Sequence, residues 1–393
     1  MSSNVQRLLR ARKYMNWRFI ALGYLSLFAL SLLDNGRSPT YNAILEDLSI
    51  GPAKGSYIFS VASFISLLVN LTAVKWLPKL GPVVSTRISL SLMALSGFFM
   101  YITGVQTSYT LLIVSSVLLG LGLAICTITM NVLVIKGSTS SSRKRLFSGL
   151  HAIYGLSSLL APFILAFLIK HGGDWKTYFV VSGIIAFSVI LITAKTETLP
   201  TEPQEKQREN QNVPVRFRIL FGLLLGAYVA SEIVISTRLP YYLRTVLKFD
   251  EITAGYYLSF FFLSLCAGRL LFSLKSFNFK SEHLMIFSHI TTLVCFFSGL
   301  YIHPLFLALC GFTMSYAFPM GMDFLVETFK EKSDYMITSV MTWIGVMLAS
   351  MHFVFGLINE NYGANIALLL SPLLSLLALG ALIIFLKSDK SSI

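Results

Sequence analysis

Apolar stretches of about twenty residues recur roughly twelve times along the chain and alternate with short polar turns. A helix of about 20 apolar residues spans the roughly 30 Å hydrocarbon layer of a bilayer. Backbone polar groups meet no water in that layer, so a crossing segment must satisfy its hydrogen bonds internally, as a helix does. The pattern therefore predicts an all-α membrane protein with twelve transmembrane helices. The expected spans are 17–44, 54–77, 87–105, 109–135, 146–170, 176–195, 218–245, 253–274, 283–302, 304–328, 337–361 and 364–387.

Composition agrees with this pattern and excludes several classes of protein. The mean hydropathy is +0.72, and only 12% of the residues are charged. Twelve spans of roughly 25 residues use about 300 of the 393 positions, which leaves no room for a soluble catalytic domain. The sequence contains no phosphate-binding P-loop, zinc signature or nucleophile motif, and its four cysteines lie in apolar segments without metal-ligand spacing. We therefore expect no enzymatic activity, no cofactor and no metal site.

The net charge of +13 is concentrated in alternate turns. Basic residues precede the first apolar stretch and recur near 75–87 and 195–218, whereas the turns Gly104–Tyr109 and Tyr301–Pro304 are nearly uncharged. This positive-inside pattern places both termini and the central connection in the cytoplasm. It accounts for the charge without nucleic acid as a partner. We expect a monomeric, multi-pass protein of the bacterial inner (plasma) membrane, in contact with the lipid bilayer.

One connection is longer and more polar than the others. Residues 195–217 mix positive and negative charges and contain three prolines, a composition that cannot bury enough apolar area to fold alone. The predicted organisation is a six-helix bundle at 1–194, a cytoplasmic linker at 195–217 and a second six-helix bundle at 218–393.

The two halves share short sequence motifs at corresponding places. Arg37-Ser38-Pro39 in the first span matches Arg238-Leu239-Pro240 in the seventh, and Met130–Val134 in the fourth matches Met322–Val326 in the tenth. Repeated halves with a site at their interface are the organisation of a transporter in which one half rocks against the other.

Several motifs together resemble a known family. They are Leu33–Pro39, Gly120-Leu121-Gly122 with Asn131, His151–Gly155, Tyr228–Glu232, Leu239–Leu243, Ala267–Leu270 and Phe318-Pro319. With these motifs the chain resembles the major facilitator superfamily, most closely its fucose-permease-like sugar:proton symporter branch. The resemblance covers most of the chain. It implies two pseudo-symmetric six-helix bundles and transport by alternating access.

Two departures from the family pattern bear on mechanism. Cys126 and Thr127 stand where the branch has a proton-coupling carboxylate in the fourth helix. The turn at 75–87 contains Gly81 and basic residues but none of the acidic residues that the superfamily commonly has there. The first departure affects the coupling mechanism, and the second removes an expected cytoplasmic gate contact.

Two carboxylates inside apolar helices are the leading proton-coupling candidates, because a charge at the bilayer centre costs at least about 2.5–3.5 kcal/mol. Asp34 and Arg37 are three residues apart and share a helix face. They form either a cavity-lining pair that controls proton exchange or a static ion pair. Glu232 lies within the apolar run Leu223–Ile235. It either binds substrate hydroxyls and a proton, or is a protonated side chain bonded to a neighbouring helix.

The remaining candidates follow from position and from the resemblance. The candidate substrate-binding residues are Arg37, Asn131, His151, Tyr228, Glu232, Tyr316 and Trp343. The candidate gating residues are Arg238, Arg269, Asp323 and Glu327. Arg238 has two other interpretations, a ligand for an anionic substrate or a structural arginine that reaches the membrane interface. Asp323 and Glu327 are expected to pair with Arg269 or Lys330 in a cytoplasmic closure contact.

The leading hypothesis is a secondary active transporter that moves a small, hydroxyl-rich, sugar-like solute by alternating access, coupled to an ion, most simply a proton. Two alternatives within transport are an exporter of amphipathic compounds and a carrier of organic anions. A third is a membrane sensor or scaffold that transports nothing.

Overall fold

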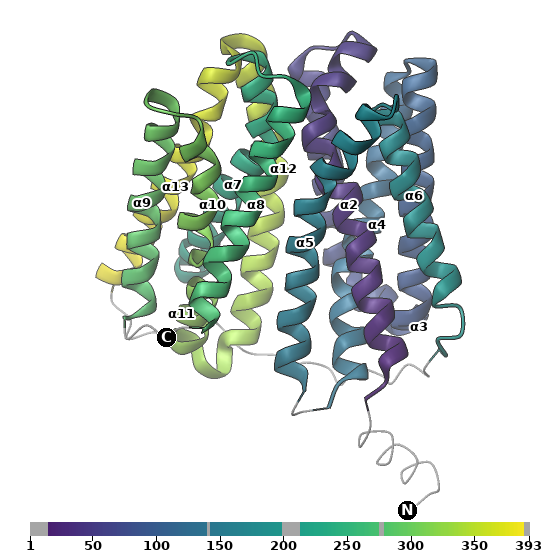
Figure 1. Ribbon diagram of the computed structural model, residues 1–393. Coiled ribbons are helices and arrows are strands. Elements are labelled where there is room, and N and C mark those ends of the chain that lie inside the picture. Colours follow the sequence, from purple (N-terminus) through teal and green to yellow (C-terminus); the bar gives the residue numbers. More distant parts are fainter. Residues whose placement is uncertain (1–14, 140–141, 199–212, 275–278, 389–393) are drawn as a thin grey trace, which may run out of the picture.

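The computed structural model describes residues 15–139, 142–198, 213–274 and 279–388, and these are helical nearly throughout (Figure 1). Twelve of the helical segments in this part are long and apolar enough to cross a membrane. The protein is therefore an all-α, multi-pass membrane protein, and the prediction of twelve spans is confirmed.

The first half contains six spans in five helical segments, one of which reverses direction at a glycine. They are α2 (Trp17–Leu48), α3 (Pro52–Gln106), α4 (Tyr109–Gly137), α5 (Arg143–Lys170) and α6 (Trp175–Ile192). Helix α3 holds both the second and the third span, and its backbone turns at Gly81, where φ is 71°. Such a positive φ favours glycine, because a Cβ atom would clash with the backbone.

The second half contains the other six spans. They are formed by α7 (Val215–Thr245), α8 (Glu251–Leu274), α9 (Ser281–Tyr301), α10 (Leu305–Met314), α11 (Ala317–Phe329), η1 (Lys330–Lys332), α12 (Ser333–Leu368) and α13 (Leu370–Lys387). The tenth span is split into α10 and α11. Helix α12 runs through Gly363, where φ is 80° and the chain reverses into the twelfth span. This reversal falls between the predicted spans 337–361 and 364–387.

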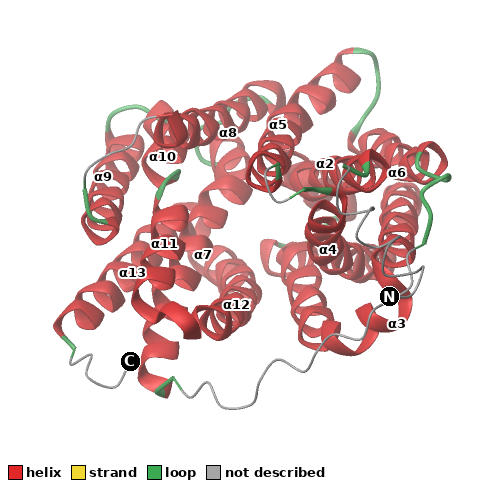
Figure 2. Ribbon diagram, turned by 90° about the horizontal axis from the view of Figure 1, so that it is seen from below, coloured by secondary structure: helices red, strands yellow, loops and turns green. Residues whose placement is uncertain are grey.

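Buried apolar side chains form two separate cores, one for each half. One core runs from Val213 to Phe385 and the other from Phe19 to Val189, the latter joined by Tyr241 and Ala364. Figures 1 and 2 show the corresponding bundles, α2–α6 and α7–α13, side by side. Of the predicted linker, residues 199–212 lie outside the described part, and α7 begins at Val215, three residues before the predicted boundary.

The start of the sixth span shows how local chemistry sets a helix boundary. Asp174 is the N-cap of α6, and its carboxylate accepts a hydrogen bond from the Thr177 backbone N–H at 2.9 Å and pairs with Lys176 at 2.7 Å. Burial alone would raise the pKa of Asp174, but the hydrogen bonds from Lys176 and Thr177 outweigh it and leave the pKa below its ordinary value.

Candidate substrate and coupling site

The break in the tenth span supplies free carbonyl groups to neighbouring helices. Pro319 has no N–H group, so it cannot bond the carbonyl of Ser315 four residues earlier. Arg269 Nε of α8 donates to this Ser315 carbonyl at 3.4 Å. The hydroxyl of Tyr228 on α7 contacts the adjacent carbonyl of Met314, the last residue of α10. The interrupted helix therefore orients two side chains of the second bundle.

Glu232 lies between the same two side chains. The Tyr228 hydroxyl donates to Glu232 Oε2 at 2.8 Å, and Arg269 Nη2 is 3.8 Å from Oε1. Tyr228 and Glu232 are four residues apart on α7, which places them on one helix face. The Glu232 side chain is 15% exposed and that of Arg269 is 37% exposed. The carboxylate is thus partly enclosed, and a cation and a phenol compensate it.

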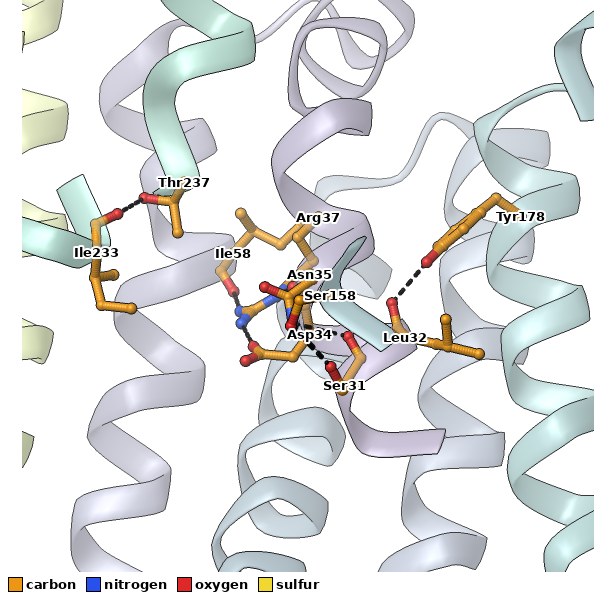
Figure 3. Close-up of polar contacts among 10 residues, drawn as sticks. All are labelled: Ser31, Leu32, Asp34, Asn35, Arg37, Ile58, Ser158, Tyr178, Ile233 and Thr237. Atoms are coloured by element: carbon orange, nitrogen blue, oxygen red, sulfur yellow. Dashed lines mark hydrogen bonds and ion pairs between the residues drawn. The ribbon is translucent and has the colours of Figure 1, made fainter. Parts of the chain in front are cut away.

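The first bundle has a second carboxylate–guanidinium pair, on α2 (Figure 3). Arg37 pairs with the Asp34 carboxylate and donates to the backbone carbonyls of Asp34 and of Ile58, the latter at 2.8 Å. Asn35 beside them donates to the Ser31 hydroxyl at 3.2 Å and to the Ser158 hydroxyl at 3.0 Å. These bonds tie α2 to α3 and α5, so the polar groups of α2 have fixed positions.

Glycine and tyrosine fix the same segment of α2 against α6. The Tyr178 hydroxyl donates to the Leu32 carbonyl at 2.7 Å (Figure 3). A Cβ atom at Gly36 would lie 2.1 Å from the Tyr178 ring. The close approach therefore requires glycine at this position.

Tyr154 of α5 lies within electrostatic range of Asp34, Glu232 and Arg269. Its backbone carbonyl accepts a hydrogen bond from the Ser31 hydroxyl of α2 at 3.1 Å. Asp34 from the first bundle and Glu232 from the second therefore lie near the same tyrosine. The Asp34 side chain is 24% exposed. Tyr154 was missed from the sequence, although it lies in the quoted motif at 151–155.

The bundles are joined at the end where α2 and α7 finish, which we call the far end. The opposite end, where α2 and α7 begin, we call the basic end. The Ser38 hydroxyl lies 3.0 Å from the Ser236 carbonyl and 2.9 Å from that of Thr237. Pro240 has no N–H group to bond the Ser236 carbonyl, which leaves that carbonyl free to accept from the other bundle.

Further contacts close the far end from both sides. Arg244 of α7 lies 3.6 Å from Glu46 of α2, and the ring centroids of Tyr41 and Tyr241 are 5.2 Å apart. Glu360 of α12 accepts a hydrogen bond from the backbone N–H at residue 53 of α3 at 2.8 Å. Ion pairs, hydrogen bonds and aromatic contacts thus hold the bundles together along this end.

Two aromatic candidates lie in packed surroundings. Tyr316 follows Met314 and Ser315, whose carbonyls contact Tyr228 and Arg269. It is buried and stacks on Phe272 with ring centroids 4.1 Å apart. Trp343 packs on Gly222 of α7, where an added Cβ would lie 2.3 Å from its indole ring. Tyr316 therefore adjoins the Glu232 group, whereas Trp343 supports α7.

Asn131 and His151 are not brought into this group by any described contact. The Asn131 amide donates to the Thr127 carbonyl of its own helix at 2.7 Å. The side chain of His151 lies outside the described residues.

Arg269 has a partner that its sequence position did not suggest, and the predicted cytoplasmic closure contact stays a prediction. Arg269 pairs with Glu232, and no ion pair among the described residues joins Asp323 or Glu327 to Arg269 or Lys330. Sequence position suggested a contact at the basic end, but the long Arg269 side chain is directed to the interior by the Ser315 carbonyl. The alternative in which Arg238 reaches the membrane interface was wrong, because Arg238 is 0% exposed.

A profile of the Major Facilitator Superfamily matches residues 23–351. The chain belongs to this superfamily. It is therefore a membrane transporter by family and not an enzyme, and the predicted superfamily membership is confirmed. No curated protein matches the sequence.

Solved transporter structures share the fold at low sequence identity. A D-xylose–proton symporter has a TM-score of 0.75 at 12% identity, with 95% of this chain and 98% of that chain covered. The nucleoside transporter NupG has a TM-score of 0.69 at 15% identity, with coverage of 95% and 100%. The fucose:proton symporter FucP of E. coli has a TM-score of 0.61 at 16% identity, with coverage of 95% and 98%.

Proposed function

We propose that the protein is a secondary transporter that carries a small, hydroxyl-rich solute, of the sugar or nucleoside class, together with a proton. The single observation that carries this proposal is the arrangement of Glu232, Tyr228 and the free Met314 carbonyl. Asp34 on the other bundle lies, like Glu232, within electrostatic range of Tyr154 and is the second proton-coupling candidate.

The arrangement around Tyr228 accommodates Glu232 in either protonation state. A phenol has one proton and can donate to one acceptor at a time. When Glu232 is ionised, Tyr228 donates to the carboxylate, which Arg269 also compensates. When Glu232 is protonated, its hydroxyl donates to Tyr228, and Tyr228 donates to the Met314 carbonyl. The Tyr228 hydroxyl and the Glu232 carboxyl group then each have a hydrogen-bond partner in both states, which is what a reversible proton site between apolar helices needs.

The same side chains suit a neutral hydroxylated solute. The partly exposed Glu232 carboxylate and Arg269 guanidinium, with the buried Tyr228 phenol beside them, offer both hydrogen-bond acceptors and donors to sugar or ribose hydroxyls. The structural similarity to symporters of xylose and fucose and to a nucleoside transporter supports this substrate class. The far end is closed by contacts between the bundles, so we propose that the site faces the basic end here and that transport requires the far-end contacts to separate.

The test is proton-driven uptake into proteoliposomes, with Glu232→Gln as the variant. Glutamine keeps the size of the side chain but cannot exchange a proton. We expect the variant to lose accumulation driven by a pH gradient while it still exchanges solute across the membrane without a gradient. Glu197→Gln, which neutralises an exposed carboxylate near the end of the first bundle, is the matched control and should behave like the parent protein.

Two results would contradict the proposal. Undiminished accumulation by Glu232→Gln would remove Glu232 from coupling. Failure of the parent protein to move any sugar, nucleoside or organic acid would favour the sensor or scaffold alternative.

A further inference from the structure

Arg238 of α7 is enclosed by aromatic rings from both bundles. Its guanidinium carbon lies 4.7 Å from the ring centroid of Tyr41, 4.3 Å from that of Phe59 and 4.6 Å from that of Phe355. Its guanidinium makes a long hydrogen bond, 3.4 Å from Nη2 to the Ser56 hydroxyl, and also interacts with the Tyr41 side chain. We call Tyr41, Phe59 and Phe355 the Arg238 cage.

The cage compensates the charge of Arg238 but not its hydrogen-bond donors. Nε and Nη1 are buried and have no hydrogen-bond partner, and no ion pair between described residues includes Arg238. Cation–π contacts favour a desolvated guanidinium. A buried N–H group without an acceptor nevertheless costs free energy, and more so on a charged group. We therefore expect the Arg238 guanidinium to find a hydrogen-bond acceptor in another conformation of the protein.

A second unpartnered basic group lies on the same ring. His352 of α12 stacks on Phe59, with ring centroids 5.1 Å apart, and its buried Nδ1 has no hydrogen-bond partner. Arg37 lies on Phe59 as well, 4.9 Å from its centroid, but pairs with Asp34. Around Phe59 there are thus two guanidinium groups and an imidazole with one carboxylate, so the cluster has an excess of positive charge.

We propose that Arg238 and His352 bind the carboxylate of an anionic solute when the far end opens, and that the Arg238 cage is the closed form of this anion site. This inference rests on the proposed alternating access and narrows the substrate class to hydroxylated acids, such as sugar acids.

The position of the site follows from the bundles that form it. Arg238, Phe355 and His352 belong to the second bundle, whereas Tyr41 and Phe59 belong to the first, so separation of the bundles at the far end takes Arg238 away from two rings of its cage. Its free N–H groups then face the opening. Arg238 is six residues beyond Glu232 on α7, about 9 Å along the helix axis. The two residues are also about 120° apart around the helix, so the anion site lies on a different face of α7 from Glu232.

The test is the thermal stabilisation of the purified full-length protein in titrations with D-glucuronate, with its neutral counterpart D-glucose, and with acetate. Stabilisation by mass action gives an apparent Kd. We expect D-glucuronate to bind at least about tenfold more tightly than D-glucose. Arg238→Gln should abolish this preference and leave D-glucose binding unchanged, and Arg238→Lys should retain part of it. Arg216→Gln removes the same charge from an exposed position on α7 and is the matched control.

A second variant keeps the inference testable if Arg238→Gln does not fold. Phe59→Leu removes a cage ring and leaves every charge in place. Because it destabilises the closed form, it should lower the apparent Kd for D-glucuronate several-fold, the opposite of the effect expected from Arg238→Gln. A purely structural Arg238–Phe59 contact predicts no such gain.

The outcomes separate the inference from the proposed function. Three results would overturn the anion site. The parent protein could bind D-glucose and D-glucuronate equally well, or Arg238→Gln could weaken the binding of both sugars equally. The third result is that none of the three probes stabilises the protein. If acetate also binds and loses this binding in Arg238→Gln, the result would support the anion site and show that the carboxylate alone is recognised. If only neutral sugars bind and their uptake is proton-driven, the anion site fails while the proposed function stands.

Discussion

Cross-linking α5 to α8 tests directly whether the two bundles move against each other. Gly155 of α5 lies against Cys266 of α8, and a Cβ atom at Gly155 would be 2.5 Å from the Cys266 sulfur. A disulfide requires an S–S distance of about 2.0 Å and a Cβ–Cβ distance of about 3.5–4.5 Å. The substitution Gly155→Cys therefore places two thiols within reach of one another after a small shift, one on each bundle.

The position of the disulfide, between the two bundles, determines how much transport is lost. A disulfide between the bundles prevents their separation along α5 and α8, so a cross-linked molecule should complete no transport cycle. Transport should then fall in proportion to the cross-linked fraction, about tenfold at roughly 90% cross-linking. In the reduced protein the extra side chain crowds Cys266 and should cost about 1–3 kcal/mol of stability.

The assay compares solute uptake into proteoliposomes before oxidation, after oxidation with copper–phenanthroline, and after reduction with dithiothreitol. Oxidation should inhibit Gly155→Cys and reduction should restore it. The double variant with Cys266→Ser cannot form the bond and should be insensitive to oxidation. Complete cross-linking, shown by mass spectrometry, with undiminished uptake would refute the argument that α5 and α8 move apart during transport.

Three further predictions concern single side chains. Tyr228→Phe removes a hydrogen bond to a carboxylate worth about 2 kcal/mol, so pH-driven uptake in proteoliposomes should fall roughly tenfold to hundredfold; an unchanged rate would contradict the proton site. Gly36→Ala drives a methyl group into Tyr178 and should lower stability by about 1–3 kcal/mol in thermal unfolding, whereas Gly380→Ala, which meets no atom within 4 Å, should not. Asp174→Ala removes an N-cap worth about 1 kcal/mol at neutral pH. The pKa of Asp174 is depressed in the folded protein. The variant should therefore show its full loss of unfolding free energy above the ordinary carboxyl pKa of about 3.9. This loss should disappear as the pH falls through the lowered pKa, where Asp174 of the parent protein becomes protonated.

Much of the fold was predictable from the sequence because it depends on local patterns. The length and spacing of apolar stretches determine the number of spans, since a bilayer requires continuous helices of a fixed length. The reversal near Gly363 and the isolation of Asp34 and Glu232 in apolar helices could also be read from neighbouring residues. The spacing of Tyr228 and Glu232 on one helix face is likewise a local property.

The partners of these side chains were decided by the tertiary structure alone. Arg269 pairs with Glu232 rather than with Asp323, and Arg238 is buried in a cage with rings from both bundles rather than directed to the membrane interface. Such contacts depend on how each helix is rotated and how closely it approaches its neighbours. Hydropathy specifies neither the rotation of a helix nor its distance from its neighbours, because an apolar helix is equally stable in lipid at many rotations. Small residues, free carbonyls and buried charges on the neighbouring helices select one of them.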